Sequence, residues 1–134
     1  MSLSPRLAAI VEALPLRPDS RVLEIGCGPG AAARAVAARL TTTGHILAID
    51  RSATPSSLAP RMSFRHVAAE EFALLPGEQP FTLVFAVRVG ALDGRHPDLG
   101  RRILARLAEV TTPDARLFTD GGTPLHELTS QLAR

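Results

Sequence analysis

The segment VLEIGCGPGAAARAV, residues 22–36, constrains the fold of this chain more than any other. It begins as an apolar run typical of a buried strand, breaks into three closely spaced glycines and continues as an alanine-rich, helix-like run. Glycine at positions Gly26, Gly28 and Gly30 lets the backbone turn sharply and lets another group approach it closely. We therefore predict a strand, a ligand-binding turn and a helix, in this order.

Strand-like and helix-like segments alternate along the rest of the chain. Apolar or alternating runs predict strands at residues 21–26, 45–50, 62–68, 81–89 and 116–120. Apolar residues at helical spacing predict helices at residues 4–16, 30–40, 98–110 and 123–134, and a single helical turn at 70–75. Such alternation forms parallel strands joined by right-handed crossovers. We predict an α/β fold with a doubly wound, mostly parallel sheet of about five strands, and one domain over residues 1–134.

Composition excludes several classes of function. All fifteen basic residues are arginine, so a lysine-containing P-loop and a lysine Schiff base are both absent. The arginines are spread without a dense cluster and the net charge is +2, so we expect no nucleic-acid partner. No apolar run has the length of a membrane span, and no signal-peptide pattern is present. We expect a cytoplasmic protein that does not contact a membrane.

The glycine turn leaves two kinds of ligand open. The pattern G-x-G-x-x-A that starts at Gly26 fits the fingerprint of a dinucleotide-binding turn. Glu24, two residues earlier, would repel a diphosphate and needs a donor such as an amino acid's ammonium group. Pro29 removes an N–H that a diphosphate would use. Asp50, at the end of the next strand, can accept the two ribose hydroxyls of either ligand.

Four segments resemble the class I S-adenosylmethionine-dependent methyltransferases. They correspond to that family's first motif, its acidic second motif, its fourth-strand motif and its helix, turn and fifth strand: VLEIGCGPGAAARAVA, ILAIDRS, FTLVFAVRVGAL and RILARLAEVTTPDARLFTD. The resemblance runs from about Arg17 to Asp120. It implies that the cofactor is S-adenosyl-L-methionine and that the chain is a short form, a methyltransferase domain alone.

The resemblance also assigns residues to the methionine part of the cofactor. The loop that contains Gly26, Cys27, Gly28 and Gly30 would hold this part. Glu24 would accept a hydrogen bond from its amino group, directly or through a water. The single cysteine, Cys27, is interpreted as a buried, inert thiol within this loop.

Three further segments are assigned to the rest of the cofactor. Asp50 would bind the ribose hydroxyls, and Arg51 would pack near the adenine. The pair Ala69–Glu70, after the third strand, would border the adenine edge. The pair Ala86–Val87, at the end of the fourth strand, would pass under the sulfonium.

The chain departs from the family pattern in two places. Ala68 stands where the family usually has an acidic residue that contacts the adenine, so Glu70 or Glu71 must replace that contact or recognition is weaker. The β-hairpin with which the family usually ends is missing, which would leave the fifth strand as an exposed edge. We expect a homodimer through this edge, or cover from the last helix.

No catalytic residue can be assigned from the sequence, because methyl transfer mainly requires that the reactants be oriented and shielded from water. His96, Asp93 and His126 are the candidates for a general base. Asp93 and Asp120 resemble the carboxylates that hold magnesium in catechol-type O-methyltransferases. The chain has no asparagine to complete such a site, so we expect no metal.

These observations predict an S-adenosylmethionine-dependent methyltransferase that acts on a small-molecule substrate. One alternative is a protein that binds S-adenosylmethionine or S-adenosylhomocysteine without transferring the methyl group, because the hairpin and the usual acidic residue are missing. A second is a nicotinamide-dinucleotide-binding domain. Glu24 and the lack of tyrosine and lysine disfavour it.

Overall fold

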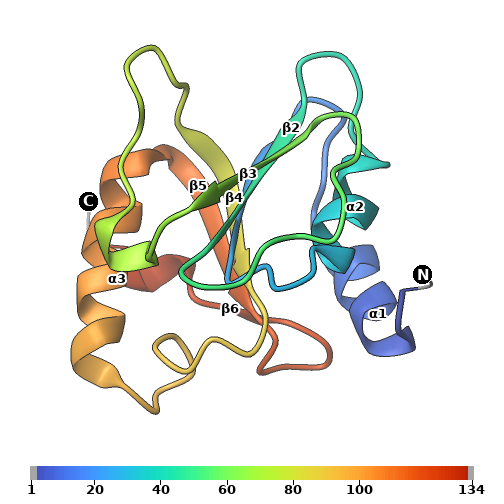
Figure 1. The fold of residues 1–134 in the computed structure, drawn as a ribbon. Helices are drawn as coiled ribbons and strands as arrows, with labels where there is room; N and C mark the ends of the chain where they lie inside the picture. The colour runs from blue at the N-terminus through green and yellow to red at the C-terminus, as the bar shows by residue number, and fades with distance from the viewer. Residues whose placement is uncertain (1–2, 133–134) are drawn as a thin grey trace.

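A computed structural model describes residues 3–132, which form a six-stranded sheet with helices on both faces (Figure 1). The strands are β1 (Arg21–Ile25), β2 (His45–Asp50), β3 (Met62–His66), β4 (Phe81–Ala86), β5 (Thr111–Thr119) and β6 (His126–Glu127). Their order in the sheet is β3-β2-β1-β4-β5-β6. Neighbours from β3 to β5 pair in parallel, and β6 pairs antiparallel with β5. The doubly wound, mostly parallel sheet is confirmed, with a sixth strand added.

The helices divide between the two faces of the sheet. They are α1 (Pro5–Ala13), α2 (Ala31–Ala37) and α3 (Pro97–Val110), with 3-10 turns η1 (Ala69–Glu71) and η2 (Thr129–Gln131). In Figure 1, α1 and α2 cover one face, whereas α3 lies on the other. The predicted start of the first helix is confirmed, because Ser4 caps it by accepting a hydrogen bond from the Leu7 N–H at 3.2 Å.

Two hydrophobic clusters hold these layers together, one on each face of the sheet. Leu23 and Ile25 of β1 belong to the cluster under α3, whereas Val22 belongs to the cluster under α1 and α2. Side chains alternate between the faces of a strand. Glu24 therefore lies on the face that α1 and α2 cover.

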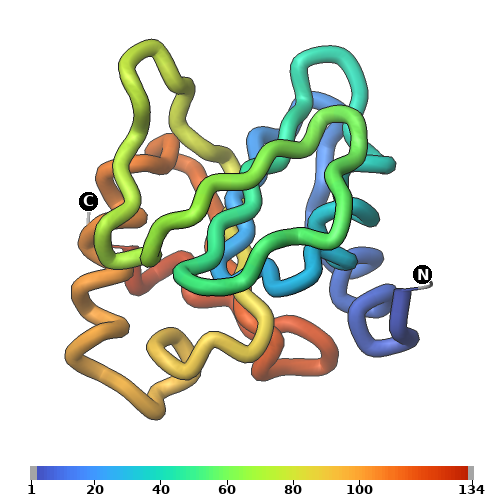
Figure 2. Tube along the Cα trace, in the orientation of Figure 1, coloured from blue at the N-terminus to red at the C-terminus, as the bar shows by residue number. Residues whose placement is uncertain are grey.

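The connections place several loops at one edge of the sheet. From β1 the chain crosses through α2 to β2 on one side, and β4 pairs on the other side. The loops that follow β1, β2, β4 and β5 all lie along the lower side of the molecule in Figure 2. Doubly wound sheets bind their ligands at this edge, near the point where the strand order reverses.

The predicted helix at residues 123–134 is wrong within the described residues; positions 133–134 lie outside them. His126 and Glu127 form β6 instead, and a single 3-10 turn follows. Leu128 and Leu132 have the spacing of a helical face, but both are buried in the cluster under α3, and the Leu128 N–H donates to the Leu117 carbonyl at 2.8 Å. Pairing with β5 satisfies backbone groups that a helix would have left unpaired.

β6 also changes the expectation of an exposed fifth strand. It pairs with β5 at Phe118 and Thr119, and Arg116 forms an ion pair with Glu127 at 2.8 Å. The end of β5 is therefore covered by the chain itself, although not by a helix. The homodimer stays a prediction.

Two smaller differences concern segment boundaries. The helical turn expected at residues 70–75 is limited to η1, because Phe72 turns inward and lies 6.0 Å from the Phe81 ring between centroids. The fifth strand begins at Thr111 rather than at 116. The residues expected to form a turn are an irregularity inside it, where the register passes from Phe81–Thr111 to Leu83–Arg116.

Candidate functional site

The loop between β1 and α2 is built from glycines in the left-handed region. The φ angles are +72° at Gly26, +53° at Gly28 and +88° at Gly30, which side chains rarely allow. At Gly30 a Cβ would also lie 2.9 Å from the Cβ of Pro55. The sequence prediction of a sharp turn after the first strand is confirmed.

Every available N–H of this loop is bonded within the protein. Gly26 and Cys27 both donate to the Ile49 carbonyl, at 2.9 and 3.1 Å, and Gly30 donates to the Cys27 carbonyl at 3.0 Å. The Gly28 N–H donates to Asp50 Oδ2 at 2.9 Å, and Pro29 has no N–H. The loop therefore presents no free backbone donor between positions 26 and 30.

Glu24 lies beside the loop as a buried carboxyl group. The residue is 3% exposed, and its Oε1 has no hydrogen-bond partner among the described residues. Burial, and then the charge on Asp50, raise the pKa of Glu24 to about 8. An unpartnered carboxyl oxygen in this setting is unfavourable unless a donor from outside the protein reaches it.

Asp50, at the end of β2, is held by three backbone donors. Oδ1 accepts from the N–H groups of Ser52 and Ala53, at 2.9 and 2.8 Å, and Oδ2 accepts from Gly28. Desolvation raises the pKa of Asp50, but these hydrogen bonds outweigh it and the pKa lies below its ordinary value. A carboxylate accepts about four hydrogen bonds. One position on Oδ2 remains, so the predicted contact with both ribose hydroxyls requires one loop donor to be displaced.

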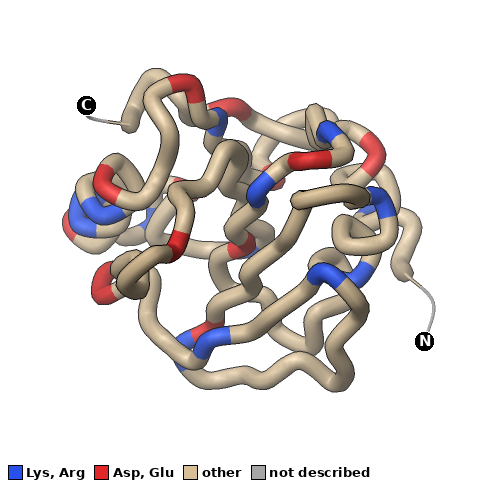
Figure 3. The backbone as a smooth tube through the Cα atoms, turned by 90° about the horizontal axis from the view of Figure 1, so that it is seen from above, with Lys and Arg blue, Asp and Glu red and all other residues tan. Residues whose placement is uncertain are grey.

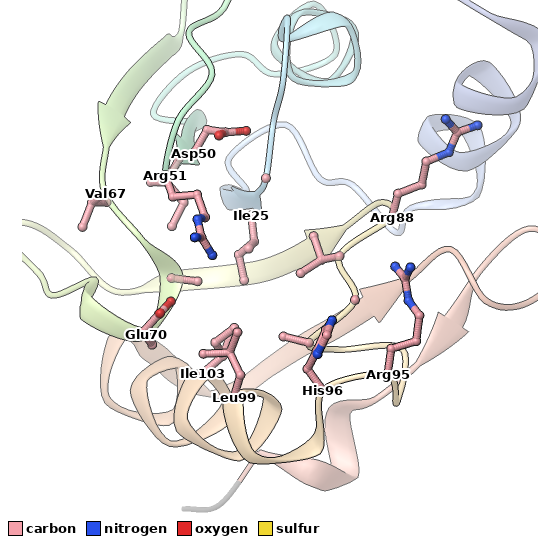
Figure 4. Close-up of a pocket in the computed structure, with 16 residues that line it drawn as sticks. Ile25, Asp50, Arg51, Val67, Glu70, Arg88, Arg95, His96, Leu99 and Ile103 are labelled. Atoms are coloured by element: carbon pink, nitrogen blue, oxygen red, sulfur yellow. The ribbon is translucent and has the colours of Figure 1, made fainter.

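Two cavities flank the loop. The first, the α3-side cavity, has a volume of about 390 Å³ and lies between the ends of β1, β2 and β4 and the start of α3 (Figure 4). The second, the α1-side cavity, has a volume of about 510 Å³ and lies between α1, the glycine loop and α2. Gly26 and Arg88 line both cavities, so the two spaces meet there.

Most residues predicted for the cofactor line one of these cavities. Those in the α3-side cavity are Gly26, Asp50, Arg51, Ala69 and Glu70. Those in the α1-side cavity are Glu24, Gly26, Cys27, Gly28 and Val87. Ala86 is 1% exposed and belongs to the core, and Gly30 packs against Pro55; neither lines a cavity.

Cys27 is a free thiol held inside the loop. Burial, followed by the charges of Glu24 and Asp50, raises its pKa to about 12. Such a thiol is not ionised near neutral pH, so it has little nucleophilic character. The prediction of an inert cysteine is supported.

The apolar wall of the α3-side cavity was not identified from the sequence. Val67, Leu99 and Ile103 line it, and Figure 4 shows Leu99 and Ile103 rising from α3 opposite Arg51. Leu99 and Ile103 are among the apolar residues at helical spacing that predict the helix at 98–110, but the sequence did not indicate that they border a ligand site. Their four-residue spacing is the only signal that could have indicated it.

The three candidate bases occupy different places. His96 lines the α3-side cavity, where Figure 4 shows its ring directed inward. Asp93 is paired with Arg95 at 2.9 Å, and His126 lies exposed on β6. Asp120, the other predicted carboxylate, is paired with Arg6 at 2.5 Å.

The remaining expectations concern a metal ion and a membrane. No group of three or more histidine, cysteine, aspartate and glutamate side chains within residues 3–132 is placed to hold a metal ion. No helix in the same part is both long and apolar enough to cross a bilayer.

The chain was compared with known proteins. A family model described as a methyltransferase domain matches residues 22–114, and no curated protein matches. A TehB-like S-adenosylmethionine-dependent methyltransferase from Corynebacterium glutamicum superposes with a TM-score of 0.62 and 16% identity, over 87% of this chain and 62% of that one. Phosphoethanolamine N-methyltransferase 2 of Haemonchus contortus, solved with S-adenosyl-L-methionine, gives a TM-score of 0.65 and 20% identity, over 85% and 27%.

This chain therefore spans less than two thirds of the length of either structure. At these identities the structural matches show a shared fold. The family model extends over more than half of the chain and includes the glycine loop, β2 and β4. The chain belongs to the methyltransferase-domain family, as its sequence motifs predicted.

Proposed function

We propose that this protein binds S-adenosyl-L-methionine across the two cavities and transfers its methyl group to a small-molecule acceptor. The observation that carries the proposal is the hydrogen bonding of the glycine loop. A diphosphate binds such a turn through free backbone N–H groups. Here all of those groups from Gly26 to Gly30 are already bonded, and what remains unsatisfied is a carboxyl oxygen of Glu24.

The methionine part fits the α1-side cavity. Its ammonium group would donate to Glu24 Oε1, which supplies the missing partner of a buried acceptor. The loop around Gly28 would border the same part of the ligand. A nicotinamide dinucleotide has no ammonium group to donate at this position. Its diphosphate would meet the negative charge of Asp50 and find no free N–H group in the loop.

The adenosyl part fits the α3-side cavity. The free position on Asp50 Oδ2 would accept one ribose hydroxyl, and Val67, Leu99 and Ile103 would enclose the adenine with apolar contacts. Glu70, on η1, lines the same cavity (Figure 4). It can make the adenine contact of the acidic residue that the family usually has at the position of Ala68.

The cofactor, when bound, supplies a methyl group activated by a positively charged sulfur. The protein then has to hold the acceptor in line with that group and keep water out. Cavities of this size suit a small molecule. His96, directed into the α3-side cavity, is the candidate to remove a proton from a hydroxyl or amino acceptor.

Methyl transfer from a radiolabelled cofactor tests this proposal. The purified protein would be incubated with methyl-labelled S-adenosylmethionine and a panel of small hydroxyl, amino, thiol and carboxyl compounds, and the released S-adenosylhomocysteine would be measured. We expect release that depends on one class of acceptor. Asp50→Ala should abolish it, whereas Asp19→Ala, which changes an exposed aspartate beside another part of the sheet, should not.

The same experiment, read together with the binding of S-adenosylhomocysteine, distinguishes methyl transfer from binding alone. If S-adenosylhomocysteine binds but no acceptor is methylated, the protein is a binding protein without transferase activity. If neither adenosyl compound binds, the assignment of the cofactor is wrong.

A further inference from the structure

We propose that Arg88, with Arg95 beside it, binds an anionic group, a carboxylate or a phosphate, on the methyl acceptor. This inference rests on the proposed function, because it names the class of molecule that enters the same site. Arg88 follows β4 and lines both the α3-side and the α1-side cavity. It therefore stands where the two parts of the bound cofactor would join, which is the position from which the methyl group leaves.

The guanidinium group of Arg88 has no partner among the described residues. Within residues 3–132, four arginine guanidinium groups form no hydrogen bond or ion pair: Arg17, Arg51, Arg88 and Arg102. Three of these line the α3-side cavity or the groove that continues it past His96. Figure 3 shows basic and acidic positions mixed along the chain, so it is the lack of partners, rather than an excess of arginine, that distinguishes this site.

The backbone holds Arg88 in an unusual conformation. Its φ angle is +59°, which is strained for a residue with a side chain. The Arg88 N–H donates to Asp120 Oδ1 at 3.2 Å, and Asp120 Oδ2 accepts from Arg6 at 2.5 Å. Asp120 thus fixes the backbone while its charge is matched by Arg6, and the Arg88 guanidinium remains free. Strained backbone conformations cluster at active sites and ligand-binding segments, and Arg88 is the one of the three described non-glycine residues with positive φ that lines these cavities.

Arg95 supplies a second guanidinium from the same loop. Its Nε and Nη2 contact Asp93 Oδ1 and Oδ2, at 3.0 and 2.9 Å, which fixes its position. It also packs over Gly90, where a Cβ would lie 3.0 Å from Nη2. Figure 4 shows Arg88 and Arg95 on the same side of the cavity, away from Glu70. Guanidinium groups bind carboxylates and phosphates through paired hydrogen bonds. Arg88 has its donors free for such a pair, whereas Arg95, paired with Asp93, adds only its remaining donor, Nη1.

The cofactor's own carboxylate is the competing ligand for Arg88. The two possibilities predict different effects of one substitution. S-adenosylhomocysteine carries the same carboxylate as the cofactor, so its affinity reports whether Arg88 binds that group. If Arg88 binds the acceptor instead, Arg88→Met leaves the affinity for S-adenosylhomocysteine within about twofold of wild type. If Arg88 binds the cofactor, the affinity falls by about tenfold or more.

Calorimetric titration of the protein saturated with S-adenosylhomocysteine tests the inference. The probes are phenyl phosphate, benzoate and the neutral benzamide. We expect one or both anions to bind about tenfold more tightly than benzamide, and Arg88→Met to remove that preference. Arg88→Lys should retain part of it. Arg17→Met is the matched control, because Arg17 is also exposed and unpaired but lies at another part of the sheet. The stronger of the two anions identifies the acceptor's charged group.

Three results would overturn the inference: equal binding of the anions and benzamide, anion binding that survives in Arg88→Met, and a loss of S-adenosylhomocysteine affinity in that variant. All three leave the proposed function standing. If wild type does not bind S-adenosylhomocysteine at all, the proposed function fails first and this inference fails with it.

Discussion

The Gly28 N–H donates to the Asp50 carboxylate at 2.9 Å, and this contact joins the glycine loop to the end of the neighbouring strand. The same carboxylate accepts from Ser52 and Ala53, at the start of the loop that follows β2. One side chain therefore fixes two loops that border the candidate site. Its negative charge also raises the pKa of Glu24.

Asp50→Ala should weaken both the fold and the binding of S-adenosylhomocysteine. Three backbone donors would lose their acceptor, and a hydrogen bond to a charged group contributes about 1.5–3 kcal/mol, less where water can replace it. We expect the free energy of unfolding to fall by about 2 kcal/mol in urea denaturation. Asp19→Ala, at an exposed position without such contacts, should change it little. Equal stability of Asp50→Ala and wild type would show that the loops are held by other contacts.

Glu24→Gln should change how stability depends on pH. The folded-state pKa of about 8 lies above the ordinary value of 4.5, so ionisation opposes folding. Ionisation of Glu24 costs the wild type no stability below pH 4.5. As the pH rises from 4.5 toward 8, the free energy of unfolding falls by up to about 1.4 kcal/mol per pH unit. Glutamine cannot ionise, so the variant should gain on wild type over this range. Unfolding curves that respond identically to pH would contradict the buried, ionisable Glu24.

The affinity for S-adenosylhomocysteine should rise with pH in the wild type. An ammonium group favours the charged form of Glu24, and below pH 8 the carboxyl group must first lose its proton. We expect the dissociation constant measured by calorimetry to fall by up to about tenfold per unit between pH 6 and 8. In Glu24→Gln the affinity should be lower and this slope absent. A wild-type affinity that is independent of pH would show that the ammonium group binds elsewhere.

Much of the fold could be predicted because the strands carry their own signal. The run HILAID is short, apolar and β-branched, and its predicted bounds at His45 and Asp50 agree with β2. The last segment could not be predicted in the same way. Leu128 and Leu132 have the spacing of a helical face, yet the backbone of His126 and Glu127 pairs with the open edge of β5 and forms β6. Whether this segment forms a helix or pairs with β5 depends on the assembled sheet, so the local sequence does not predict it.

Part of the candidate site could also be predicted from the sequence. The spacing of Glu24, the glycines and Asp50 placed these residues together, as the structure also does. The three donors to Asp50 and the bonded state of the loop N–H groups depend on how two loops pack, so no motif indicates them. The charge of Arg88 was visible in the sequence, but its lack of a partner became evident only from the positions of Asp93 and Asp120.

Gly100→Ala should destabilise the protein, although alanine favours helices. A Cβ at Gly100 in α3 would lie 2.2 Å from the Ala91 carbonyl oxygen, in the loop that borders the α3-side cavity. Overpacking of this kind costs about 1–3 kcal/mol, which exceeds the gain of about 1 kcal/mol in helix propensity. The exposed Ala105→Gly in the same helix should show only the ordinary propensity cost. A more stable Gly100→Ala in urea denaturation would mean that α3 can move away from the loop.

The central claim is that the glycine loop, with Glu24 and Asp50, binds an adenosyl amino acid and not a dinucleotide. Calorimetric titration of the wild-type protein with S-adenosylhomocysteine, adenosine and NAD tests it most directly. The account predicts that S-adenosylhomocysteine binds clearly more tightly than adenosine, because only the former reaches Glu24, and that NAD does not compete. Binding of NAD at least as tight as that of S-adenosylhomocysteine would contradict it.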